Sequence, residues 1–147
     1  MNSLWKWPLA VCILAAPLLA GALLLQVEDS ASNPEALRNN AVLVARITAC
    51  HSPEKTTVTA TAEGVLNGAR QSIPLHVISL STAGTFAVRR EWPSQGTWAI
   101  KMVATNPDYK DYATSVVVPF RSESAQWSLA KHYFHAPTDA EIHLALN

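Results

Sequence analysis

The residues Thr56–Glu63, which read TTVTATAE, decide the fold of this chain. Val58, Ala60 and Ala62 fall on one side of this segment, and polar side chains alternate with them. Successive side chains of a β-strand point to opposite faces, so the segment predicts a strand with one apolar and one polar face. That pattern is typical of an antiparallel strand that covers a core on one side and meets water on the other.

Further segments indicate strands by alternation or by their β-branched residues: 41–49, 73–80, 85–92, 97–105 and 114–120. Turn residues separate them, and Asn67-Gly68 is a strong signal for a tight hairpin. No helical pattern intervenes, which excludes a parallel βαβ architecture. The series of short strands and turns predicts an all-β, Ig-like antiparallel β-sandwich of about six or seven strands.

Two tryptophans flank the turn at Pro93–Gly96. Trp98 alternates with Ile100 and Met102, which predicts that its indole ring lies in the core. An exposed aromatic platform for sugars or peptides, formed by Trp92 and Trp98, is the alternative interpretation.

An apolar segment precedes the strands and predicts export. Residues Trp7–Leu25 form a stretch of 19 residues without a charged side chain, with Lys6 before it and Glu28 after it. A helix of about 20 apolar residues can span a bilayer, and a positive flank keeps its near end in the cytoplasm. The rest of the chain is therefore expected in the periplasm.

Two fates of this segment remain open. Ala20-Gly21-Ala22 has the small-x-small pattern of a signal-peptidase site, which favours a cleaved signal peptide. Leu23–Leu25 continue the apolar run beyond that site and give it spanning length, which favours an uncleaved inner-membrane anchor.

The remaining segments complete a four-part organisation. The polar stretch after the apolar segment is a predicted linker with one helical turn at Pro34–Arg38. In the tail, Thr138 and Glu141 form a capping box that predicts a short C-terminal helix. The predicted parts are a signal peptide or transmembrane anchor, a polar linker, the β-sandwich and the tail, at residues 1–25, 26–40, 41–120 and 121–147.

Composition and charge exclude several classes of function. Lys+Arg and Asp+Glu both number 11, and no cluster of like charge occurs. Nucleic-acid binding is therefore not expected, because it relies on Lys and Arg to neutralise phosphates. The chain lacks the serine-hydrolase, zinc-protease, phosphate-loop and dinucleotide-binding motifs, so neither an enzyme nor a cofactor is predicted. Cys50 is the only thiol outside the apolar segment, so no internal disulfide is expected.

His132 and His135 are the candidate metal ligands. Two imidazoles three positions apart lie on one side of a helical turn, where they could chelate a divalent or cuprous ion. The alternative is a packed or surface segment in which the histidines form hydrogen bonds. Cys50 and His51 are a second candidate pair, which could act together only where the chain has left strand geometry. The alternative for Cys50 is a small, partly buried apolar side chain.

The segment between Gly84 and Lys101 carries a resemblance to a known family. Gly84-Thr85-Phe86 is followed by Pro93-Ser94-Gln95-Gly96-Thr97-Trp98. This order resembles the Gly-x-aromatic and Pro-x-x-Gly-x-Trp hairpin of small periplasmic β-sandwiches of the YtkA-like and FixH-like group, whose wider architecture includes CopC-like domains. The resemblance implies the β-sandwich fold and bacterial export and, in some members, copper handling or respiratory-oxidase assembly. No position of this chain matches a CopC-type copper ligand.

Together these features predict a non-enzymatic, exported or membrane-tethered β-sandwich that serves as an accessory or binding module for a protein partner in the envelope. Membrane contact is expected through the N-terminal segment. The alternative is a periplasmic metal-handling accessory that binds copper through His132 and His135, joined by His143 if the chain reverses near Pro137.

Overall fold

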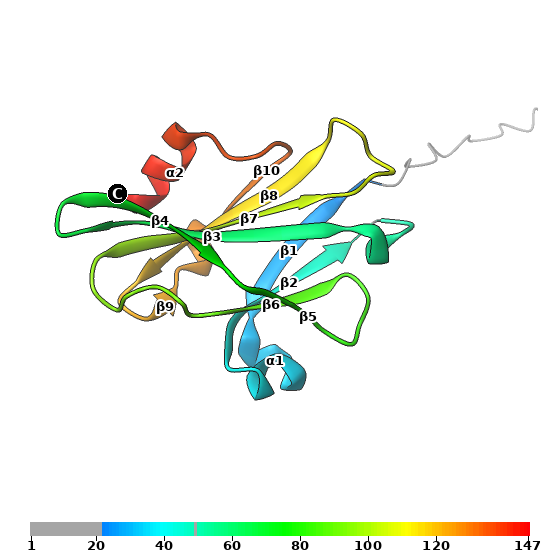
Figure 1. The fold of residues 1–147 in the computed structure, drawn as a ribbon, viewed down its shortest axis with the longest axis horizontal. Helices are drawn as coiled ribbons and strands as arrows, with labels where there is room; N and C mark the ends of the chain where they lie inside the picture. The colour runs from blue at the N-terminus through cyan, green and yellow to red at the C-terminus, as the bar shows by residue number, and fades with distance from the viewer. Residues whose placement is uncertain (1–21, 49) are drawn as a thin grey trace, which may run out of the picture.

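The computed structural model describes residues 22–48 and 50–147. Within these residues, two antiparallel β-sheets stack face to face as a sandwich (Figure 1). The smaller sheet has the spatial order β1 (Leu24–Asp29), β2 (Ala41–Thr48), β6 (Thr85–Arg89) and β5 (Val77–Ser79). The larger sheet has the order β10 (Lys131–Tyr133), β8 (Ala113–Arg121), β7 (Thr97–Thr105), β3 (Thr57–Leu66) and β4 (Ala69–Leu75), and β9 (Ser124–Ala125) pairs with the end of β8. The helices are α1 (Pro34–Arg38) and α2 (Asp139–Leu146), with short 3-10 turns at Ser30–Ser32, Pro53–Lys55 and Trp127–Leu129.

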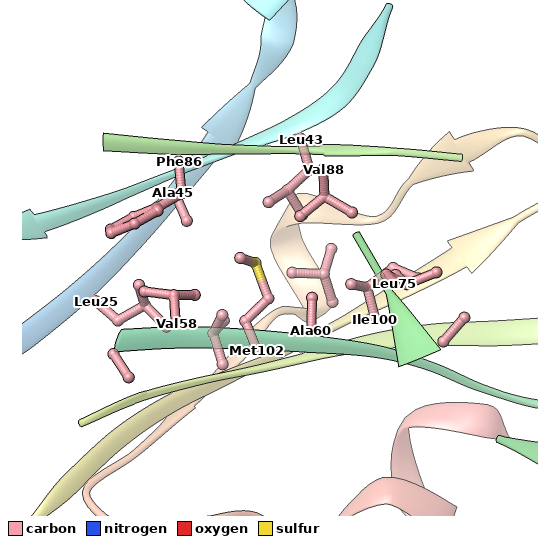
Figure 2. Close-up of a cluster of buried hydrophobic side chains, with 14 of the residues drawn as sticks. Leu25, Leu43, Ala45, Val58, Ala60, Leu75, Phe86, Val88, Ile100 and Met102 are labelled. Atoms are coloured by element: carbon pink, nitrogen blue, oxygen red, sulfur yellow. The ribbon is translucent and has the colours of Figure 1, made fainter. Parts of the chain in front are cut away.

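The main core fills the space between the two sheets (Figure 2). β3 contributes Val58, Ala60 and Ala62, none of them more than 8% exposed, so the alternation that predicted this strand is confirmed. The opposite sheet contributes apolar side chains from β1, β2 and β6, namely Leu25, Leu43, Ala45, Phe86 and Val88. The mostly β, two-sheet architecture therefore agrees with the sequence pattern.

The single strand predicted at 73–80 is two strands in different sheets. β4 pairs with β3 as far as Leu75, the chain crosses over at His76, and β5 then pairs with β6. Both halves contain strand-forming residues, so the alternation of side chains could not show where the chain leaves the larger sheet and joins the smaller one.

The predicted hairpin ahead of β4 is confirmed, because Asn67 and Gly68 have φ of 52° and 78°, as a type I′ turn requires. Pro74 lies on the edge strand β4, where proline is tolerated.

The largest departure from the sequence prediction concerns the residues before α1. Leu24 and Leu25 were predicted to end the apolar segment, and the residues after them to form a linker. The residues Leu24–Asp29 form β1 instead, and this strand pairs with β2 along its whole length. The side chains of Leu23 and Leu25 are only 0% and 2% exposed. A strand that begins inside a continuous apolar run has no boundary that hydrophobic periodicity can reveal.

Both helices confirm sequence predictions and cover outer faces of the sandwich. The side chain of Asn33 caps α1, and Ala36 packs on the smaller sheet. The predicted capping box is present at the start of α2, whose Ile142 and Leu146 pack on the larger sheet against Val117. This cover explains why β8 is buried on both faces.

The tail is less separate from the sandwich than predicted, because β9 and β10 belong to the larger sheet. The rest of the predicted apolar segment, residues 1–21, lies outside the described residues. None of the helices in the described ranges has the length and apolar character that a membrane crossing needs.

Candidate functional site

Loops from separate parts of the sequence meet at the end of the sandwich where β1 begins, which we call the loop pole (Figure 1). Three of these loops are residues 50–56, 106–112 and 134–138. They come together because β2, β7 and β10 end here while β3 and β8 begin here, as the antiparallel registers require. Loops held by a rigid scaffold are frequent locations for binding residues.

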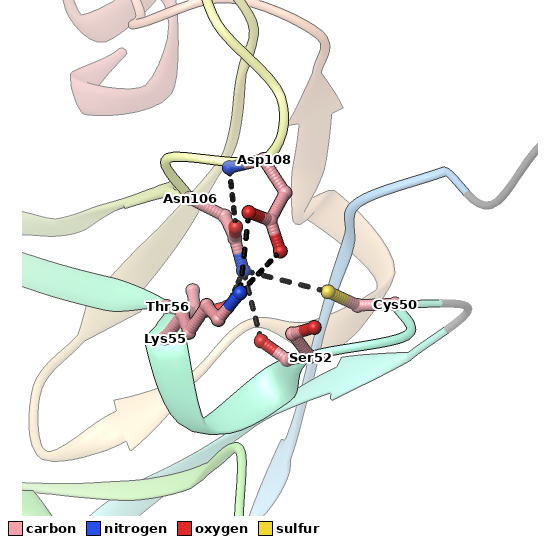
Figure 3. Close-up of polar contacts among 6 residues, drawn as sticks. All are labelled: Cys50, Ser52, Lys55, Thr56, Asn106 and Asp108. Atoms are coloured by element: carbon pink, nitrogen blue, oxygen red, sulfur yellow. Dashed lines mark hydrogen bonds and ion pairs between the residues drawn. The ribbon is translucent and has the colours of Figure 1, made fainter.

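Asn106 ties two of these loops together (Figure 3). It is 4% exposed, and its Nδ2 donates to the carbonyl oxygen of Ser52 at 2.9 Å and to Thr56 Oγ1 at 3.0 Å. Its Oδ1 accepts from the backbone N–H of Asp108 at 2.9 Å. On the surface, Lys55 Nζ lies 3.1 Å from Asp108 Oδ2. The buried amide has partners for both its nitrogen and its oxygen, so it fixes the relative position of the two loops.

An open groove of about 590 Å³ crosses the loop pole, and we call it the pole groove. Tyr109, Tyr112 and Phe134 form its aromatic side, and Phe134 is 63% exposed. The ring centroids of Tyr112 and Phe134 are 6.2 Å apart, with 32° between the ring planes. Two loops distant in sequence thus present one aromatic surface, while Lys110 and Asp111 add one charge of each sign to the groove lining.

Phenol groups give the pole groove polar positions as well. The hydroxyl of Tyr112 donates to the carbonyl oxygen of Leu23 at 3.5 Å, which joins the groove to the segment that leads into β1. Burial raises the pKa of the Tyr109 phenol, and the nearby Cys50 thiol raises it further. Tyr109 therefore keeps its proton at neutral pH and can donate a hydrogen bond.

Cys50 and His51 both lie at the loop pole, off the end of β2, and the geometry favours packing over chemistry for this pair. The Cys50 Sγ accepts a weak hydrogen bond from Asn106 Nδ2 at 3.5 Å and packs against the edge of the core. His51 is exposed, and in the described part of the chain no hydrogen bond joins it to Cys50. Cys50 therefore matches the expected small, partly buried side chain.

His132 and His135 do not share a helical turn. His132 belongs to the edge strand β10 and lines a pocket of about 210 Å³ with Glu28 and Arg46. His135 lines the pole groove instead, with its Nε2 3.0 Å from Glu141 Oε1. The expected helical turn is not formed, because Lys131–Tyr133 pair with β8 as a strand and His135 lies in the loop that follows. Over the ranges that the structure describes, no group of three or more His, Cys, Asp or Glu side chains is placed to hold a metal ion.

Trp92 and Trp98 do not form an exposed platform, because they are only 5% and 2% exposed. Trp92 packs edge-on against Phe120, with ring centroids 5.1 Å apart and 76° between the planes. The Nε1 of Trp98 donates to the carbonyl oxygen of Gln95 at 2.7 Å. The prediction that Trp98 lies in the core is confirmed.

The exposed aromatic surface lies instead in the pole groove, which was not predicted from the sequence. Tyr109 and Tyr112 carried a usable signal, because Asn106-Pro107-Asp108 marks their segment as a loop. Phe134 carried none, since its exposure depends on the unexpected strand β10.

A second groove, of about 330 Å³, lies beside α2 on the outer face of the larger sheet. Leu129 and Leu144 line it and are 49% and 74% exposed. It is less aromatic than the pole groove, because Tyr133 is the one aromatic side chain among the described residues that line it.

Comparisons with known proteins provide no family assignment. No family model, no curated protein and no solved structure matches the chain. The resemblance to the YtkA-like and FixH-like group therefore stays a prediction.

Proposed function

We propose that this chain is an exported, non-enzymatic binding module with an Ig-like sandwich, and that it captures a protein partner of the envelope in the pole groove. The observation that carries the proposal is the exposure of Phe134 beside Tyr112. Exposed apolar clusters of this kind commonly mark sites of association. Aromatic residues are also enriched where proteins contact one another.

The composition of the pole groove supports a protein partner over a polyanion or a lipid surface. Its charged side chains include Lys110 and Asp111, which are of opposite sign, so no net basic field favours phosphates. Tyr109 and Tyr112 combine an apolar ring with a hydroxyl, as residues at interface hot spots often do. The buried Asn106 holds the loop that bears them, and such preorganisation lowers the entropic cost of binding.

Site-specific crosslinking of the full chain in living cells tests this proposal. A photoreactive phenylalanine analogue replaces Phe134 and, in matched controls, Leu37 on α1 or Leu144 in the second groove. All three side chains are more than half exposed. We expect a discrete protein adduct from position 134 and none from the controls. Adducts of equal yield at all three positions, or none at position 134, would contradict the assignment of the pole groove.

Binding of the identified partner, once purified, gives the quantitative test. Phe134→Ala should weaken the affinity at least tenfold, since truncating a hot-spot side chain costs more than about 1.4 kcal/mol. Leu37→Ala should leave the affinity unchanged. Equal affinities for wild type and Phe134→Ala would show that the ring is not a contact.

A further inference from the structure

The sandwich uses leucines that also belong to the apolar N-terminal run. Leu23 and Leu25 are 0% and 2% exposed and belong to the main core. Leu24 begins β1 and lies opposite Thr48 of β2. These residues cannot occupy the hydrocarbon of a bilayer and the interior of the sandwich at the same time. In the folded protein, the apolar run available to a membrane therefore ends at Ala22.

That shorter run does not fit a permanent anchor. Trp7–Ala22 comprises 16 residues, and a helix of this length extends about 24 Å at 1.5 Å per residue. The hydrocarbon core of a bilayer is about 30 Å thick. A positively charged start, an apolar stretch of roughly 7–15 residues and a small-x-small end are the parts of a signal peptide, and Lys6, the run from Trp7 and Ala20-Gly21-Ala22 supply them in that order.

We infer that a signal peptidase hydrolyses the peptide bond between Ala22 and Leu23, an inference that rests on the export proposed above. Water adds across this bond as it breaks, and the products are a carboxylate on Ala22 and an amino group on Leu23. The structure supports this position because the folded domain begins there. Leu23 is fully buried in the main core, whereas Ala22, the residue before it, is exposed. Cleavage here removes the export segment and leaves every residue of β1 in the mature protein.

Processing at this bond also places the new amino terminus at the loop pole. The carbonyl oxygen of Leu23 accepts the hydrogen bond from Tyr112, a residue that lines the pole groove. The mature chain would thus begin beside the proposed binding surface, with the amino group one residue ahead of β1.

The test is the amino-terminal sequence and intact mass of the protein recovered after expression of the full chain in a Gram-negative host. We expect a mature protein that begins at Leu23. Ala22→Phe and Ala20→Phe should accumulate the uncleaved precursor in the membrane fraction, because both small positions of the site are then occupied by a large ring. Gly21→Leu is the matched control and should be processed like the wild type, since the middle position of the site is unrestricted.

The outcomes separate this inference from the proposal of export. An uncleaved chain whose sandwich is accessible from the periplasm overturns the processing site but leaves export standing. An amino terminus at any other residue, or processing of Ala22→Phe at the wild-type level, also overturns it. An uncleaved chain in the cytoplasm contradicts both.

Discussion

At the scale of single residues, Gly64 and Trp98 show how one strand accommodates the largest side chain of the core. They lie directly opposite each other on β3 and β7. A Cβ atom on Gly64 would overlap the six-membered ring of Trp98, with its Cζ3 only 2.6 Å away. The absence of a side chain at position 64 thus lets the indole lie flat against β3.

Gly64→Ala should therefore destabilise the fold, because the ring has to move out of a packed position. Overpacking of this kind costs about 1–3 kcal/mol, which for a domain of this size lowers Tm by roughly 3–15 °C. Gly68→Asn is the control, since it lies in the hairpin with nothing near its missing Cβ and Asn tolerates the positive φ. Thermal unfolding monitored by circular dichroism measures both. Equal melting temperatures for Gly64→Ala and wild type would show that the ring is not held against β3.

The sequence predicted the inward face of β3 but not the role of Gly64. Val58, Ala60 and Ala62 follow a local period of two, which any strand must show if one face is buried. The need for glycine depends on the register between β3 and β7, and register is set by tertiary pairing. For the same reason Phe134 could not be assigned to the pole groove before β10 was known.

At the scale of elements, β7 and α2 were predictable because their signals are contained within their own residues. β7 spans Thr97–Thr105, as its alternation predicted, and α2 follows the capping box of Thr138 and Glu141. β1 and β10 could not be predicted in this way. The first is merged with an apolar run, and the second has only three residues, which are ordered by their pairing with β8.

The start of α2 predicts a specific dependence of stability on pH. The backbone N–H of Thr138 donates to the Glu141 carboxylate at 2.8 Å and lowers its pKa, with a further contribution from His135. A carboxyl whose pKa is lower in the folded state stabilises the fold above its unfolded pKa, which is about 4.3. This stabilisation is lost as the pH falls through the folded pKa.

Glu141→Gln should accordingly melt below wild type at pH 7, and the difference should shrink as the pH is lowered from about 5 toward 3. The measurement is Tm as a function of pH for both proteins. Glu54→Gln is the control, because Glu54 lies on an exposed turn and its carboxylate has no hydrogen bond or ion pair in the described ranges. A difference between wild type and Glu141→Gln that stays constant over this range would contradict the role of the capping carboxylate.

At the scale of the whole molecule, the imidazoles of the two candidate metal ligands line different surfaces. His132 lines the pocket near Glu28, while His135 is engaged by Glu141 at the loop pole. Two imidazoles alone would leave a tetrahedral ion two ligands short. We therefore expect no binding of Zn²⁺, Cu²⁺ or, under reducing conditions, Cu⁺ at micromolar affinity or tighter.

Calorimetric titration of the purified protein with each ion tests this expectation, and a His132→Ala/His135→Ala double variant serves as the comparison. Binding at micromolar affinity or tighter that disappears in the double variant would contradict it. That result would favour the copper-handling alternative over a protein-binding module.

The architecture of the sandwich follows from its strands, whereas its proposed role depends on where the molecule is and on which end faces a partner. The apolar run and Lys6 direct the proposed export, and β1 connects that segment to the loop pole. The proposed binding function and the proposed cleavage both require that the β-sandwich lies outside the cytoplasm. It can be measured without knowledge of the partner.

The most direct measurement is the activity of an alkaline phosphatase fused after Asn147 of the full chain, compared with a fusion to a fluorescent protein that folds only in the cytoplasm. The phosphatase needs disulfides, which form outside the cytoplasm. We predict that the phosphatase fusion is active and that the fusion to the fluorescent protein does not fluoresce. Phosphatase activity should be lost when Leu14 and Leu18 in the apolar run are replaced by Asp. A bright fluorescent fusion with an inactive phosphatase would contradict the placement of this β-sandwich in the envelope.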